Sequence, residues 1–199
     1  MPPKRVSHVK PEDLPEPLEV RVLKRWIPNF KNKEKMIDLC YLLVDIHGDT
    51  IEAVADVTKA EYFDSLINVQ HCYTVDKYVS SPQRQYMPSV PHVASLKIGK
   101  RATFTPLLDK DIPTYYYNFA TYDDLAPTMK PPKLLTDICC RRNEIEVTLW
   151  DEKADMIETE DIIGKVFEIT ATMVTYFKKL QLESTTSTTI VINPPIPDL

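Results

Sequence analysis

IEVTLWDEKA (residues 145–154) decides the fold, because the chain contains a matching pattern ninety-four residues earlier, IEAVADVTKA (51–60). Ile, Glu, Lys and Ala coincide in the two stretches, and the same offset sets apolar positions of 72–79 on apolar positions of 166–173 without a gap. Such a match indicates an internal repeat, in which one structural module is used twice. The repeated pattern alternates apolar and polar residues, which predicts a β-module.

The first copy predicts a small closed β-barrel with a short helix. LEVRVLKRW (18–26) alternates as a half-buried strand, and two further strands within 37–57 meet at a tight turn formed by His47, Gly48 and Asp49. A short helix is expected over 58–67, with Thr58 as its N-cap. The remaining strands are expected within 71–79, 92–98 and 101–107. This all-β pattern is typical of a Greek-key barrel.

The second copy is incomplete. Leu18 to Asp56 spans 39 residues in the first copy, whereas Leu134 to Trp150 spans only 17 in the second. About one to two strands are therefore missing, and a barrel cannot close normally without them. The open edge is left unpaired, supplied by the linker, or supplied by another chain.

Length, composition and charge define the other segments. The chain has 199 residues, 43% of them hydrophobic and 27% charged, with a net charge of −5. Residues 1–17 are rich in proline and charge, which predicts a disordered tail. The boundaries expected are 18–108 for the first barrel, 109–133 for an extended aromatic linker whose rings dock onto a barrel, and 134–199 for the truncated second barrel.

Catalysis, metal binding and membrane insertion find no support in the sequence. The four histidines and four cysteines show no metal-ligand spacing, and no nucleotide-binding or hydrolase motif is present. No apolar stretch is long enough to span a membrane, and the N-terminus has no apolar signal-peptide core. The sequence predicts a non-enzymatic intracellular protein without a cofactor or a small-molecule substrate.

Cations beside aromatic residues recur along the chain, in the combination that holds single-stranded nucleic acid. A basic loop with an interleaved Trp packed beneath it remains the alternative for the first group, and core burial remains the alternative for Trp150. The candidate binding residues are Lys24, Arg25, Trp26, Lys31, Lys33, Arg84, Tyr86, Arg141, Arg142, Trp150, Phe177, Lys178 and Lys179.

A family resemblance rests on two stretches near the C-terminus. IEVTLWDEKAD (145–155) followed by VTYFKKLQLESTTSTTIVINPPIPDL (174–199) resembles the second DNA-binding domain of the replication protein A large subunit. DIPTYYYNFATYDDL (111–125) resembles the linker entering that domain, and residues from 18 onward resemble the preceding domain as found in the subunit's plant relatives.

The resemblance implies two tandem oligonucleotide-binding (OB) folds that bind single-stranded DNA in replication, repair or recombination, in the nucleus, with other replication protein A subunits as possible partners. It assigns base stacking to Trp150 and Phe177 in the second copy and to Tyr86 in the first. The other first-copy position is occupied by Asp56, whose carboxylate would repel phosphate instead of stacking a base.

Two alternatives stay open beside single-stranded DNA binding. A degenerate relative could serve as a protein-interaction module with little DNA binding, and an OB groove does not by itself distinguish RNA from DNA. The charge is unevenly distributed between the two halves of the chain. Residues 1–105 carry 15 basic and 13 acidic residues, whereas residues 106–199 carry 9 basic and 16 acidic residues. The acidic second half predicts weak long-range steering and a binding energy dominated by stacking.

Overall fold

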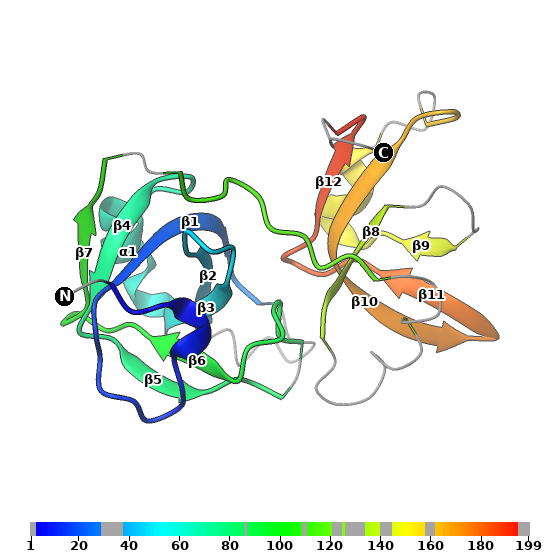
Figure 1. The fold of residues 1–199 in the computed structure, drawn as a ribbon. Coiled ribbons are helices and arrows are strands. Elements are labelled where there is room, and N and C mark those ends of the chain that lie inside the picture. The colour runs from blue at the N-terminus through cyan, green and yellow to red at the C-terminus, as the bar shows by residue number, and fades with distance from the viewer. Residues whose placement is uncertain are drawn as a thin grey trace. The chain divides into compact units, whose positions relative to one another are not determined.

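The structure is a computed structural model that describes residues 3–28, 38–85, 87–108, 111–120, 125, 134–139, 145–157 and 162–194. The chain forms two compact units, Met1–Arg84 with Val90–Tyr116, and Gln85–Ser89 with Tyr117–Leu199. Both consist mainly of β-strands with a few short helices (Figure 1). This confirms the predicted all-β class with two modules in tandem.

The first unit is a single curled sheet. Its strands follow the order β5-β6-β3-β2-β1-β4-β7, and only Lys77 and Tyr78 separate β4 from β5. Because β4 pairs with β1 while β5 pairs with β6, this short bend brings the two ends of the sheet together. The strands are β1 (Leu18–Trp26), β2 (Asp38–Val44), β3 (Thr50–Asp56), β4 (Cys72–Asp76), β5 (Val79–Pro82), β6 (Ala94–Lys97) and β7 (Thr103–Pro106).

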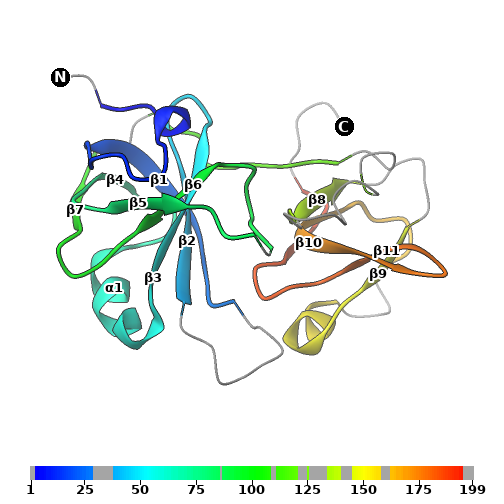
Figure 2. The same cartoon turned by 90° about the horizontal axis from the view of Figure 1, so that it is seen from below.

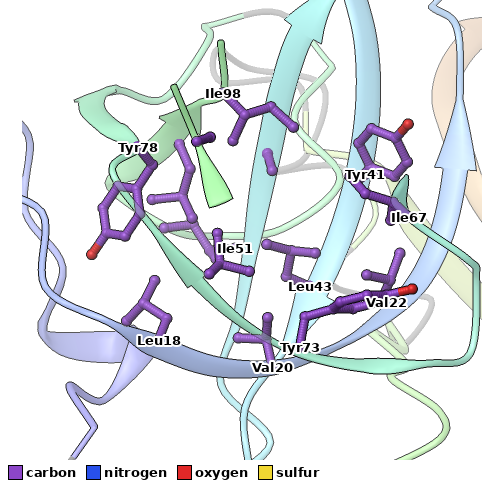
Figure 3. Packing of buried hydrophobic residues seen from close by; sticks show 14 of the residues in the cluster. Leu18, Val20, Val22, Tyr41, Leu43, Ile51, Ile67, Tyr73, Tyr78 and Ile98 are labelled. Carbon is purple, nitrogen blue, oxygen red and sulfur yellow. The ribbon is translucent and has the colours of Figure 1, made fainter. Parts of the chain in front are cut away.

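Apolar side chains at alternate positions of the strands fill the inside of this barrel. Leu18, Val20 and Val22 of β1 point inward and meet Leu43 of β2 and Ile51 of β3, all completely buried (Figure 3). Burying each such side chain stabilises the folded state by about 1.5–3 kcal/mol relative to leaving it in water. The alternation seen in the sequence therefore locates the core of the first unit correctly.

The predicted turn between β2 and β3 is also confirmed. Gly48 has a φ of +82°, which most side chains would disfavour. Asp45 fixes the turn because its Oδ1 accepts hydrogen bonds from the backbone N–H groups of His47 and Asp49, at 2.9 and 3.0 Å.

The predicted helix begins differently from what the sequence suggested. A 3-10 turn, η3 (Val57–Lys59), precedes α1 (Ala60–Leu66). The capping side chain is Asp56, whose carboxylate accepts a hydrogen bond from the N–H of Thr58 at 2.9 Å. Thr58 is therefore not the N-cap, because the turn already starts at Val57 and the Asp56 carboxylate accepts the N–H and the hydroxyl of Thr58.

The prediction that residues 1–17 form a disordered tail is wrong for the residues that the structure describes. Val6 of the short 3-10 helix η1 (Val6–His8) and the adjacent Val9 belong to the barrel core, at 0% and 1% exposure. Asp45 Oδ2 accepts the N–H of Val6 at 2.9 Å, and Arg5 pairs with Asp49 at 2.6 Å. Two valines in a polar segment thus provide enough contact to order it.

The second unit repeats this pairing scheme with fewer strands. It contains β8 (Thr136–Cys139), β9 (Glu146–Thr148), the 3-10 helix η5 (Asp151–Met156), β10 (Phe167–Phe177), β11 (Lys179–Glu183) and β12 (Thr189–Ile192). The parallel pair β9–β11 corresponds to β3–β6, and the antiparallel pairs β8–β10 and β12–β10 correspond to β1–β4 and β7–β4. Among the described residues, no strand corresponds to β2.

The linker takes over part of the missing strand's pairing. Phe119 forms a parallel bridge with Asp137 of β8, whose backbone accepts from Ala120 N–H at 3.3 Å and donates to Asn118 O at 3.1 Å. The buried Asp137 carboxylate accepts two further N–H groups, from Asn118 at 2.6 Å and from Ala171 of β10 at 2.7 Å. Of the three sources considered for this edge, the linker is the one observed at β8.

The N-terminal segment is expected to contribute to stability. Val6→Ala should lower the free energy of unfolding of the first unit by about 2 kcal/mol, because it removes buried methyl groups and leaves a cavity. Urea unfolding followed by Trp26 emission in a Trp150→Phe background measures this. Leu14→Ala is the matched control, since Leu14 lies in the same segment with 84% of its surface exposed. Equal stability of both variants would contradict the assignment.

Asp137 is expected to hold the linker against β8. Asp137→Ala should destabilise the second unit by about 3 kcal/mol, because the buried N–H of Ala171 and the partly buried N–H of Asn118 both lose a charged acceptor. Amide hydrogen exchange should show lost protection at Asn118 and Ala171, while Asp155→Ala, at an exposed carboxylate of η5, leaves both amides protected. Unchanged exchange at both amides in Asp137→Ala would rule out this role.

Candidate nucleic-acid interface

The strands β9, β11 and the end of β10 lie side by side in one sheet (Figure 2), and the residues on one of its faces pack in the core of the second unit. Val147, Leu182 and Val174 are cross-strand neighbours, and all three pack in the core of the second unit. Because side chains alternate along a strand, their sequence neighbours lie on the other face. We call this the outer face; it carries Glu146, Thr148, Trp150, Met173, Thr175, Phe177, Lys179, Gln181 and Glu183.

Trp150 and Phe177 lie at opposite ends of β11 on the outer face. Trp150 continues β9 in extended conformation, and its N–H donates to Ser184 Oγ at 2.8 Å, just past β11. Phe177 stands opposite Lys179 at the start of β11. Five residue steps separate Lys179 from Ser184, or about 17 Å along the strand. The rings are 54% and 67% exposed, so both can accept a stacking partner.

The lysines beside Phe177 are held by neighbours in the second unit. Lys178 turns the chain from β10 to β11 with a φ of +63°, and its ammonium nitrogen lies 5.6 Å from the centroid of the Phe177 ring. Lys179 pairs with Glu146 across the outer face, with 3.1 Å between Nζ and Oε2. Thr175 Oγ1 donates to Glu183 at 3.1 Å. Counted together with Lys178 at its edge, the outer face has two lysines and two glutamates, so its described residues are close to neutral.

Trp150 and Asp56 occupy the same structural position in the two units. Asp56 is the last residue of β3 and Trp150 lies two residues after the end of β9, and each is the N-cap residue of the 3-10 helix that comes next. Hydrogen bonds from the Thr58 side chain and backbone lower the pKa of the Asp56 carboxyl below its usual value. The sequence alignment of Asp56 with Trp150 is therefore correct, and Asp56 is engaged in capping.

Two candidate cations of the first unit, Arg25 and Arg84, are paired inside it. Arg25 forms two hydrogen bonds with Asp64 of α1, Nε to Oδ1 and Nη2 to Oδ2, both at 2.9 Å. Arg84 pairs with Glu52 of β3 at 3.0 Å, and the Glu52 side chain is fully buried. Lys24 is half-buried on β1. Neither arginine is available as an unpaired surface cation.

Trp26 lies in a second apolar cluster and not on the surface. With 5% of its surface exposed, it packs with Cys40, Leu42 and Val90, and Tyr116 of the linker packs against them. Burial raises the pKa of the neighbouring Cys40 thiol to about 12. Of the two interpretations of Trp26, the structure agrees with a packed side chain. The remaining candidates, Lys31, Lys33, Tyr86, Arg141 and Arg142, lie outside the described residues.

Glu52 and Glu146 are the site residues that sequence reasoning missed. They occupy the same position of the internal repeat, and this coincidence is the feature of the sequence that could have identified them. Within the described ranges, no group of His, Cys, Asp and Glu side chains is arranged to hold a metal ion, and no helix is long and apolar enough to cross a membrane.

Comparison with solved structures supports the fold. A chain of a replication protein A heterotrimer bound to single-stranded DNA matches with a TM-score of 0.59 and 16% identity, over 97% of this chain and 52% of that one. The chain thus spans about half the length of this neighbour. A murine DNA-binding protein bound to double-stranded DNA matches with a TM-score of 0.43 and 12% identity, over 92% of this chain and 98% of that one. No family model and no curated protein matches the sequence.

The OB fold predicted from the sequence is therefore confirmed. The first neighbour covers nearly the whole chain, and the pairing schemes of the two units correspond to one another as a tandem repeat requires.

The Glu52–Arg84 pair is expected to stabilise the first unit. Arg84→Met removes the cation facing a buried carboxylate and should lower the free energy of unfolding by about 3 kcal/mol. Adding Glu52→Gln should recover most of that loss, because the buried charge is then removed as well. Urea unfolding followed by Trp26 emission in a Trp150→Phe background measures both. A double variant no more stable than Arg84→Met would argue against the pair.

Proposed function

We propose that the chain binds single-stranded DNA by stacking bases on Trp150 and Phe177. The observation that carries the proposal is the placement of two exposed rings on one outer face, at the two ends of β11. Base stacking on such a ring contributes about 1–3 kcal/mol and tolerates every base. The structural neighbour bound to single-stranded DNA has the same fold, which supports this ligand class.

The proposal includes a mode of binding in which stacking outweighs charge. Lys179 is paired with Glu146, and Lys178 lies against Phe177. Each phosphate neutralised by a free cation adds to the salt dependence of binding. A face whose charges offset one another should bind with a shallow salt dependence.

The wider assignment also belongs to this proposal. It places the chain as a non-enzymatic relative of the replication protein A large subunit, of the plant-like type, acting in the nucleus in DNA replication, repair or recombination, together with other subunits of that complex. Its support is the sequence resemblance at 145–155 and 174–199 together with the shared fold.

Titration with fluorescently labelled oligo-dT tests the proposal. The double variant Trp150→Ala/Phe177→Ala should bind at least about tenfold more weakly, since two stacking contacts are lost. Tyr176→Ala is the matched control: Tyr176 is 63% exposed and adjacent to Phe177, but strand alternation places it on the opposite face. Titrations at two salt concentrations give the slope.

The outcomes separate the candidate functions. Binding of oligo-U in preference to oligo-dT would favour an RNA ligand. No binding of either oligonucleotide at low salt would reject the proposal and favour a protein-interaction role.

A further inference from the structure

The first unit has a face equivalent to the outer face of the second. Ile51, Ala53 and Ala55 of β3 point into the barrel core, so Glu52 and its alternate neighbours point away from it. The offset of ninety-four residues sets Glu52, Val54 and Asp56 on Glu146, Thr148 and Trp150. The two faces can therefore be compared position by position.

In the first unit this face is covered by the protein's own apolar side chains. Val54 packs against the cluster of Trp26, Cys40, Leu42 and Val90, with Leu23 and Tyr116 at its margin. A base stacks only on a ring that it can reach from solvent. Trp26 has 5% of its surface exposed, whereas Trp150 has 54%.

Arg84 closes the same face. Its guanidinium carbon lies 6.0 Å from the centroid of the Trp26 ring, and Nη2 lies 3.0 Å from Oε1 of Glu52. A flat cationic group is thus placed over the ring, and the buried carboxylate neutralises its charge. In the second unit the corresponding acid, Glu146, remains half-exposed and pairs with Lys179 at the surface.

We infer that the outer face of the first unit, over the residues that the structure describes, is closed by its own side chains, so that base stacking is confined to the second unit. The inference rests on the proposed function and narrows it. The chain should bind short single-stranded segments with the site size of one OB fold, about 4–16 nucleotides. The cluster of Glu52, Arg84 and Trp26 is what distinguishes the two units.

The two tryptophans of the chain provide the experiment, because one lies in each unit. Trp150→Phe keeps an aromatic ring for stacking and leaves Trp26 as the only tryptophan, while Trp26→Phe leaves Trp150. Iodide should quench Trp150 severalfold more strongly than Trp26. Oligo-dT should change the emission of the Trp26→Phe chain. It should leave the emission of the Trp150→Phe chain unchanged, although anisotropy of a labelled oligonucleotide shows binding.

Cross-linking of the wild-type chain gives a second readout that does not depend on a core substitution. Oligo-dT containing 4-thiothymine should cross-link only to peptides of the second unit. Cross-links to peptides of the first unit (Met1–Arg84 or Val90–Tyr116), strong iodide quenching of Trp26, or a change of Trp26 emission on binding would overturn the inference while leaving the proposed function intact. Absence of oligonucleotide binding by the wild-type chain would overturn the proposed function, and this inference with it.

Discussion

Pairing of strand edges is the constraint on which the whole structure depends. A β-strand exposes hydrogen-bonding groups along both edges, and a barrel is stable because it leaves few of them unpaired. In the first unit β1 meets this requirement between β2 and β4, and the short bend at Lys77 and Tyr78 closes the circuit. Among the described residues of the second unit no strand corresponds to β2, and residues 118–120 pair with β8 instead. Asp137 makes this replacement possible, because one buried carboxylate bonds both the linker and β10.

The same repeated strand has been used in two different ways. Glu52 and Glu146 occupy the same position of the internal repeat. Glu52 is buried and pairs with Arg84, whereas Glu146 lies at the surface and pairs with Lys179. A buried carboxylate requires a nearby cation, and once Arg84 supplies it, that arginine also covers Trp26. One change of burial therefore accounts for both the closed face of the first unit and the pairing of its candidate cation.

Local patterns predicted what depends on local sequence. Local patterns located β1, the turn at Gly48 and the strand β9 that precedes Trp150, because each is determined by residues within a few positions. The burial of Trp26 could not be predicted in this way, since it depends on Val90, Arg84 and Tyr116, which lie far away in the sequence. The prediction for the N-terminal segment was wrong for the same reason. Its composition is typical of a disordered tail, but Val6 and Val9 pack in a barrel core formed by residues far away in the sequence.

Charge shows most clearly why composition is a poor guide to the site. Basic residues near aromatics suggested a cationic groove, yet Arg25 is paired with Asp64, Arg84 with Glu52 and Lys179 with Glu146. Each pair removes a cation from the set that could neutralise phosphate without changing the number of basic residues in the sequence. What remains for a ligand on the outer face of the second unit is the exposed rings of Trp150 and Phe177, and stacking on rings is insensitive both to net charge and to base identity. A chain with a net charge of −5 can therefore hold single-stranded nucleic acid, provided that the energy comes from Trp150 and Phe177.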